Sequence, residues 1–397
     1  MSVLTGNTPV STSPFTIGYV LEKLRNAGET GCDVENLESF HAEDITGGVA
    51  FFSEIYVVKF QWKKPASLTS VVVKVPMLKG AREHLKKGFD PETAARLAES
   101  LTEYLEESHK LEEAVYTFYS KTAISGLKLP KFFYSASFNK NTTEGVLIIE
   151  DLTGVAATTK MIPGLNDEQV CAIIEELAHL HAVSLQNRAW FEELSNLNYL
   201  ETMITEFTKT ALKLIDIDAT RFEDLVHRFI PLVTVDSMQN GIFNDVKFGA
   251  PPVLTHGDLW ASNILWARNS EGAPSNELTA IIDWQLARPG HPGIDIGRLL
   301  GLNTPAAYRR ANTDRLLKLY HDKLGGHLET APPMTLEQLK EGYNKSLVNV
   351  TLFISYGVPS YYKMESVVGS PEDPELQEEL LDRCHKLFED TLVALEN

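Results

Sequence analysis

The chain has 397 residues, with 36 Lys and Arg against 54 Asp and Glu, which gives a net charge of −18. Such acidity argues against a nucleic-acid-binding protein, which must present a basic face to phosphates, and against a basic membrane-surface patch. Hydrophobic residues make up 43% and charged residues 23%, the ordinary range for a globular protein. Neither nucleic acid nor a membrane is therefore an expected partner.

The cysteines and the uncharged first residues indicate in which cellular compartment the protein is expected. Cys32, Cys171 and Cys384 are too few and too scattered for a disulfide framework or a thiolate zinc site. The first residues lack the basic start and unbroken apolar stretch of a signal peptide, so about fifteen residues are predicted to form a loose leader. No run of about 18 apolar residues could span a bilayer. A cytoplasmic protein is expected.

Residues 1–153 combine predicted strands with one long helix. Strand-forming residues fill 55–60, 71–75 and 146–150, and the second run is closed by Pro76. A helical spacing of apolar residues extends from about Asp90 to Lys121. This part of the sequence predicts a small, β-rich N-terminal lobe.

Residues 154–397 are predicted to be mostly helical. Asn166 and Gln169 have the spacing of a helix N-terminal cap, and helical stretches also cover about 190–245 and the last hundred residues. Short apolar strands are expected at 253–255 and 279–282. The pattern indicates an α+β protein, in which a hinge near 150–154 joins the small lobe to a larger helical lobe.

The segment His256-Gly-Asp-Leu-Trp-Ala-Ser-Asn263 carries the sharpest chemical signal. Asp258 and Asn263 have the spacing of a kinase catalytic loop, and Asp283 ends an apolar run twenty residues later. Phosphoryl transfer needs a carboxylate that accepts the proton of the attacking hydroxyl, which suits Asp258. It also needs hard oxygen ligands for Mg²⁺, which suit Asn263 and Asp283. The structural alternative is a polar turn beside the core.

Lys74 interrupts an apolar strand, where a buried ammonium needs a partner. In kinases such a lysine binds the nucleotide phosphates and is positioned by a helical glutamate. We favour Glu112, which shares its helix face with Tyr116 and Tyr119, and Glu113 remains the alternative. A lysine at a strand edge that reaches solvent is the other interpretation.

Further nucleotide contacts are predicted where the lobes would meet. The carbonyl of Glu150 and the amide of Leu152 could pair with an adenine edge, although a simple acidic hinge explains the same residues. Gly47, Gly48 and Ser53 could form a turn that approaches phosphates, or could simply close a hairpin.

These motifs together resemble the ecdysteroid-kinase-like (CHK kinase-like) family, in its nematode-type branch, which is related to choline kinases and aminoglycoside phosphotransferases. The resemblance covers roughly residues 40–360. It rests on the segments His256–Trp266, Ile281–Gln285, Leu177–Ser184 and Ile149–Leu152.

The resemblance implies a two-lobed protein-kinase-like fold, with Asp258 as base, Asn263 and Asp283 as magnesium ligands and Lys74 as phosphate-binding lysine. It also implies that Asp295, in Gly290-His-Pro-Gly-Ile-Asp-Ile-Gly297, anchors the catalytic lobe. The sequence departs from protein kinases in reading Asp-Trp-Gln for Asp-Phe-Gly and in lacking Ala-Pro-Glu, so a protein substrate is not expected.

The function predicted from the sequence is an ATP-dependent kinase that uses Mg²⁺ and phosphorylates a hydroxyl of a small molecule. A catalytically silent nucleotide-binding scaffold and a metal-dependent phosphohydrolase are the alternatives. The acceptor could be a steroid alcohol, a choline-like amine or another metabolite, and the oligomeric state is left open. His181 is predicted to be a packed core histidine.

Overall fold

The computed structural model describes residues 5–46, 53–76, 91–122, 124–138, 144–194, 200–243, 251–362, 364, 367 and 374–396. The chain divides into two compact units. The first unit consists of Met1–Thr122 and Pro130–Gly154, and the second of Ala123–Leu129 and Val155–Asn397.

The first unit is built on a five-stranded antiparallel sheet with the order β1-β2-β3-β5-β4. Its strands are β1 Leu37–Asp44, β2 Ser53–Trp62, β3 Ser70–Pro76, β4 Phe132–Ala136 and β5 Val146–Glu150. The three predicted strands correspond to β2, β3 and β5. β1 and β4, which the sequence did not predict, are the two edges of the sheet.

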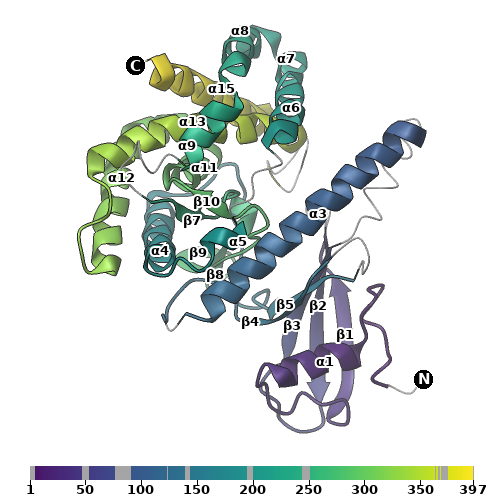
Figure 1. The fold of residues 1–397 in the computed structure, drawn as a ribbon. Coiled ribbons are helices and arrows are strands. Elements are labelled where there is room, and N and C mark those ends of the chain that lie inside the picture. The colour runs from purple at the N-terminus through teal and green to yellow at the C-terminus, as the bar shows by residue number, and fades with distance from the viewer. Residues whose placement is uncertain are drawn as a thin grey trace. The chain divides into compact units, whose positions relative to one another are not determined.

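Alternation along the strands gives the sheet two different faces. One face joins a core with helix α1, Ile17–Asn26, which lies across the sheet in Figure 1. The strand residues that enter this core include Tyr56, Val58, Val71, Val73 and Ile148. Lys74 pairs with Ile55 across the β2–β3 ladder, so its side chain belongs to the opposite face.

The expected loose leader is wrong for the described residues 5–15. Val10 is fully buried and Phe15 nearly so, and both belong to the core under the sheet. Pro9 forms a β-bridge with Thr16, which then caps α1 by accepting a hydrogen bond from the Tyr19 amide. The sequence did not reveal this, because only two apolar residues of the segment enter the core and prolines and a glycine surround them.

Helix α3, Pro91–Ser120, covers almost the full length predicted from about Asp90 to Lys121. Its C-terminal half packs on the edge strand β4. The Tyr116 ring stacks on Phe132 with centroids 6.1 Å apart, and His109 Nε2 lies 2.8 Å from the Ala136 carbonyl. These contacts hold the helix on the sheet and leave Glu112 buried.

The second unit is mostly helical, as predicted. Its helices are α4 Asp167–Gln186, α5 Phe191–Leu194, α6 Leu200–Ala211, α7 Lys213–Ile217, α8 Ala219–Phe229, α9 Val235–Phe243, α11 Gly293–Asn303, α12 Ala306–Leu328, α13 Leu336–Tyr361 and α15 Pro374–Glu396. The expected cap is confirmed, because Asn166 and Gln169 form a reciprocal capping box at the start of α4. Among the described residues, no helix is long and apolar enough to cross a membrane.

Short strands carry the loops of the second unit. They are β6 Ala156–Ala157, β7 Val253–Thr255, β8 Ile264–Arg268, β9 Pro274–Ile281 and β10 Arg288–Gly290. β6, β8 and β9 form one antiparallel sheet, and β7 pairs with β10. β7 has the bounds of the predicted strand 253–255. β9 begins five residues before the predicted strand 279–282 and ends one residue before its end.

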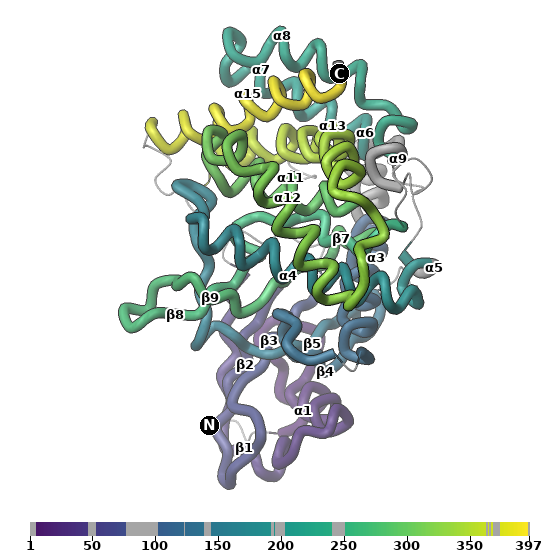
Figure 2. Tube along the Cα trace, turned by 90° about the vertical axis from the view of Figure 1, so that its left-hand side faces the viewer, coloured from purple at the N-terminus to yellow at the C-terminus, as the bar shows by residue number. Residues whose placement is uncertain are grey.

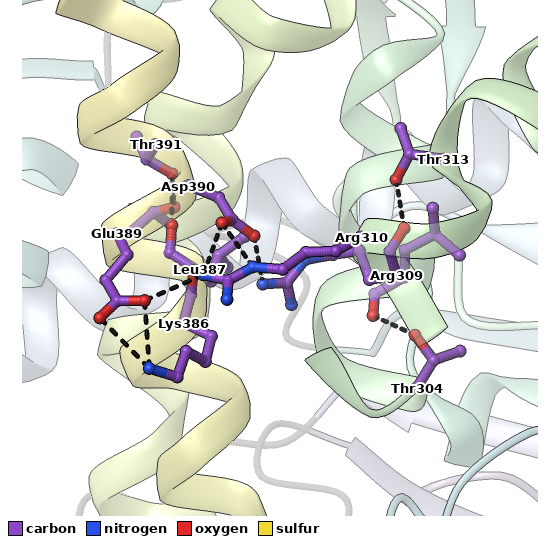
Figure 3. A network of polar contacts seen from close by, with 11 residues as sticks. Thr304, Arg309, Arg310, Thr313, Lys386, Leu387, Glu389, Asp390 and Thr391 are labelled. Carbon is purple, nitrogen blue, oxygen red and sulfur yellow. Dashed lines mark hydrogen bonds and ion pairs between the residues drawn. The ribbon is translucent and has the colours of Figure 1, made fainter. Parts of the chain in front are cut away.

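Helix α11 is the centre of the second unit, since all eleven of its residues are buried. It packs against α13, and α15 covers both (Figure 2). Arg383 of α15 donates hydrogen bonds of 2.8 Å to the carbonyls of Met161 and Leu302 and a further one to Pro163. Arg309 and Arg310 of α12 pair with Asp390, which lies about two helical turns further along α15 (Figure 3).

The short segment Ala123–Leu129 belongs to the second unit, although the sequence on both sides of it belongs to the first. The Lys128 amide donates to Glu176 Oε1 of α4 at 2.7 Å, and the Lys128 carbonyl accepts from the Ile281 amide of β9 at 2.8 Å. Hydrogen bonds therefore attach the segment to both α4 and β9 of the second unit.

Candidate active site

The segment between β7 and β8 contains the predicted catalytic loop, and a glycine gives it its shape. Gly257 has a φ of +81°, in the left-handed region. A Cβ at this position would lie 2.6 Å from the Leu286 carbonyl oxygen. Both the backbone conformation and the available space therefore require glycine immediately before Asp258.

Asp295 of α11 holds the start of this loop. Its carboxylate accepts hydrogen bonds of 2.8 Å from the amides of His256 and Gly257, and its side chain is fully buried. Burial acts to raise the pKa of Asp295, but His181, His256 and the Gly257 amide outweigh it, so this pKa lies below its ordinary value. The anchoring role that the family resemblance implied is confirmed by these bonds.

His256 joins the loop to the segment that carries Asp283. Its Nδ1 accepts from the Asp258 amide at 3.1 Å, so its Nε2 carries the proton and donates to the Ile282 carbonyl at 2.9 Å. The imidazole ring also packs 4.6 Å from the ring of Trp284. One histidine thus fixes the backbone beside both predicted aspartates.

Asp258 is largely buried, with 14% of its side chain exposed, and its carboxylate is paired. Oδ1 accepts from Nη2 of Arg298 at 2.7 Å. Within the described ranges, no hydrogen bond reaches Oδ2, the second oxygen. Sequence reasoning missed Arg298, which lies forty residues away and gives no signal beyond its spacing of one helical turn from Asp295.

Asn263 has one end of its amide fixed. Its Nδ2 donates to the Asp258 carbonyl at 3.0 Å, which directs Oδ1 away from that bond. The side chain is 5% exposed. A buried amide that is oriented in this way is suited to ligate a hard cation.

Asp283 lies at the same end of the β8–β9 hairpin as Asn263. Asn263 precedes β8 and Asp283 follows β9, the strands are antiparallel, and the Ile282 amide donates to the Asn263 carbonyl at 3.0 Å. Asp283 has a φ of +67°, a strained conformation for a residue with a side chain and one that is enriched at functional sites. Carboxylate and amide oxygens are donors that Mg²⁺ prefers, so the chemistry of these two side chains fits a magnesium ion.

Lys74 and Glu112 form the other predicted group, which lies within the first unit. Lys74 Nζ is 2.7 Å from Glu112 Oε2, with 12% and 3% of the two side chains exposed. Glu113 instead accepts hydrogen bonds from Ser135 and Ser137, at 2.9 and 3.0 Å. Of the two candidate glutamates, the structure pairs Glu112 with the lysine.

A hollow of about 590 Å³ lies on the Lys74 face of the first unit's sheet. Val57 lines it, and Val57 is two residues along β2 from Ile55, the cross-strand partner of Lys74. The segment that follows β5 also lines it, through Asp151, Thr153 and Gly154. The hollow therefore joins the lysine's face of the sheet to the predicted hinge.

The remaining predicted nucleotide contacts are placed around this sheet. Glu150 ends β5, and its carboxylate accepts from the Lys131 amide at 3.0 Å. Leu152 follows directly, and its amide donates to no other group in the described part of the chain. Ser53 begins β2. Gly47 and Gly48 lie outside the described residues.

Other predicted features are structural. His181 is 1% exposed, with Nδ1 2.8 Å from the Tyr320 hydroxyl, so it is the packed core histidine that the sequence predicted. Trp266 and Trp284, which flank the site motifs, are fully buried and so are packing residues. Trp260 is nearly buried and stacks on Tyr361 with centroids 5.3 Å apart.

Comparison with known proteins assigns the family. The model of the DUF1679 family, described as "Uncharacterized oxidoreductase dhs-27", matches residues 21–397. The chain belongs to this family. It is 29% identical to the uncharacterized kinase-like protein D1044.1 of Caenorhabditis elegans, over 86% of this chain and 90% of that protein. It is 21% identical to dhs-27 of the same organism, over 88% of this chain but only 42% of dhs-27.

Among solved structures, a choline kinase from Cryptosporidium parvum Iowa II has a similar fold. The TM-score is 0.53 at 12% sequence identity, and the match covers 96% of this chain and 93% of that one. The expected protein-kinase-like fold, with an N-terminal antiparallel sheet and a mostly helical C-terminal part, is confirmed. The resemblance to the nematode kinase-like branch is confirmed as well.

Proposed function

We propose that this DUF1679 member is a small-molecule kinase that transfers the γ-phosphate of ATP to a hydroxyl group. The observation that carries the proposal is the hydrogen-bonded assembly at one end of the β8–β9 hairpin. It combines a carboxylate with an available oxygen, Asp258, with two oxygen donors, Asn263 and Asp283. Phosphoryl transfer requires this set of groups, because its catalysis depends mainly on positioning and charge.

The reaction then follows from the roles of these residues. The acceptor hydroxyl donates a hydrogen bond to Asp258 Oδ2, and its oxygen attacks the γ-phosphorus. Its proton passes to Asp258 while the bond to the β,γ-bridging oxygen breaks and its electron pair leaves with ADP. Asn263 and Asp283 would hold Mg²⁺, which when bound would supply charge neutralisation on the triphosphate.

Nucleotide binding is assigned to the first unit. Lys74, held by Glu112, binds the phosphates in this proposal, together with Ser53 at the start of β2, the strand that pairs with the lysine's strand β3. The Glu150 carbonyl and the Leu152 amide pair with the adenine edge. The hollow on the Lys74 face supports this assignment, since it extends from the lysine's side of the sheet to the residues after Glu150.

The test is a mass-spectrometric screen of metabolite extracts for molecules that gain one phosphate in the presence of the protein and Mg·ATP. The gain should fall to a small residual rate with Asp258→Asn and be retained with Asp322→Asn, a control at an exposed aspartate of α12. Binding of Mg·ATP without transfer to any molecule would favour the silent scaffold. Release of phosphate from phosphoesters without nucleotide would favour the phosphohydrolase.

A further inference from the structure

Helix α11 contacts the Asp258 loop at two points that lie one turn apart. Asp295 binds the loop backbone, and Arg298, three residues later on the same face, binds the Asp258 carboxylate at 2.7 Å. We propose that Arg298 is a positioning residue that fixes the orientation of the Asp258 carboxylate for phosphate transfer. This inference rests on the proposed function.

The surroundings of Arg298 keep its guanidinium in one place. Its side chain is 5% exposed, and the group lies 5.5 Å above the centroid of the Phe353 ring. It extends from a helix whose residues are all buried. A rigid cation bound to Oδ1 restricts rotation of the carboxylate, and Oδ2 is then directed to one position.

Restricted rotation matters because the base must meet the acceptor hydroxyl in a narrow range of geometry. A displacement of about 1 Å at a reacting group costs on the order of a hundredfold in rate. This effect acts through Asp258, so it does not require Arg298 to touch a substrate.

The chain contains a matched pair that serves as control. Arg309 of α12 is 2.7 Å from Asp390 of α15, with 3% and 26% of the two side chains exposed (Figure 3). The Arg298–Asp258 pair has the same distance, with 5% and 14% exposed. Loss of either arginine should reduce stability, but only Arg298 adjoins a residue of the proposed reaction.

The experiment compares Arg298→Gln, Arg298→Lys and Arg309→Gln, each alone, and Arg298→Gln in an Asp258→Asn background. The rate of phosphate transfer from Mg·[γ-³²P]ATP is measured with the acceptor found in the screen and with water. Arg298→Gln should lower kcat by about tenfold to a hundredfold with the KM for ATP within about twofold of wild type. Arg298→Lys keeps the charge but not the planar guanidinium, so its kcat should lie between those of wild type and Arg298→Gln.

If Arg298 acts through Asp258, the losses of kcat caused by substituting the two residues should not add. In the Asp258→Asn background, Arg298→Gln should cause no further loss of kcat, and Arg309→Gln should lower Tm without lowering kcat. Equal kcat values for Arg298→Gln and Arg309→Gln would overturn the inference, and so would additive losses.

Crystal structures of wild type and Arg298→Gln test the positioning directly. Rotation or disorder of the Asp258 carboxylate in the variant would support it, and an unchanged carboxylate would refute it. If the wild type transfers no phosphate, the proposed function fails, and this comparison still decides whether Arg298 orients Asp258.

Discussion

The bond between Asp295 and the catalytic loop gives the sharpest stability prediction. Asp295→Asn replaces one carboxylate oxygen by an NH₂ group, while the amides of His256 and Gly257 both still require an acceptor. One buried N–H must lose its partner and face another donor. The side chain is fully buried, so water does not reach the site to compensate.

The size of the effect follows from these two bonds. A hydrogen bond to a charged group contributes about 1.5–3 kcal/mol, and an unsatisfied buried donor costs about 1–3 kcal/mol. We expect Asp295→Asn to lower the free energy of unfolding by about 2–4 kcal/mol. For a unit of this size, each kcal/mol lowers Tm by about 2–4 °C, so the decrease should be roughly 5–15 °C.

The pH dependence provides a second measurement. The pKa of Asp295 is lowered from an ordinary 3.8, so its contribution to stability is complete above that value and is lost as the pH falls below it. The difference in unfolding free energy between wild type and Asp295→Asn should therefore shrink as the pH falls below about 4.

Thermal unfolding by circular dichroism at pH 7, with urea titrations at several pH values, measures both effects. Asp322→Asn, at an exposed aspartate, is the control and should change Tm by less than about 2 °C. A Tm of Asp295→Asn within that same margin would show that the two backbone bonds do not hold the loop.

Three further predictions concern other parts of the molecule. Burial raises the pKa of Glu176 to about 7, above its ordinary 4.5, so the free energy of unfolding of the wild type should fall as the pH rises between these values. Urea titrations should show a smaller fall for Glu176→Gln. Lys74→Met should weaken Mg·ATP binding by about tenfold to a hundredfold in calorimetry, whereas Glu113→Gln should leave it within twofold. Arg383→Met should lower the unfolding free energy by about 2–4 kcal/mol, because buried carbonyls lose a charged donor; an unchanged denaturation midpoint would contradict this.

The sequence predicts the interior of the sheet better than its edges. β2, β3 and β5 each have neighbours on both sides, and their runs of Val and Ile follow from that burial. β1 has only one neighbour, and its residues Leu37–Asp44 are mostly exposed and include several charges. An edge strand of this kind has no apolar pattern by which to recognise it.

The same contrast holds at the candidate site. The spacing of Asp258, Asn263 and Asp283 is visible in the sequence because one loop and one hairpin carry them. The pairing of Arg298 with Asp258 depends on tertiary packing of α11 against that loop, which no local pattern encodes. The left-handed backbone of Asp283 is likewise set by its surroundings, since aspartate tolerates this conformation better than most residues but seldom adopts it.

The segment Ala123–Leu129 has a consequence for dissecting the protein. A fragment that ends at Gly154 would contain this segment without Glu176 or Ile281, and the complementary fragment would expose a carboxylate and a strand edge that the segment normally covers. A single cut after Gly154 would therefore remove hydrogen-bond partners from both fragments. Separate production of the second unit should succeed better when residues 123–129 are grafted onto its N-terminus through a flexible linker.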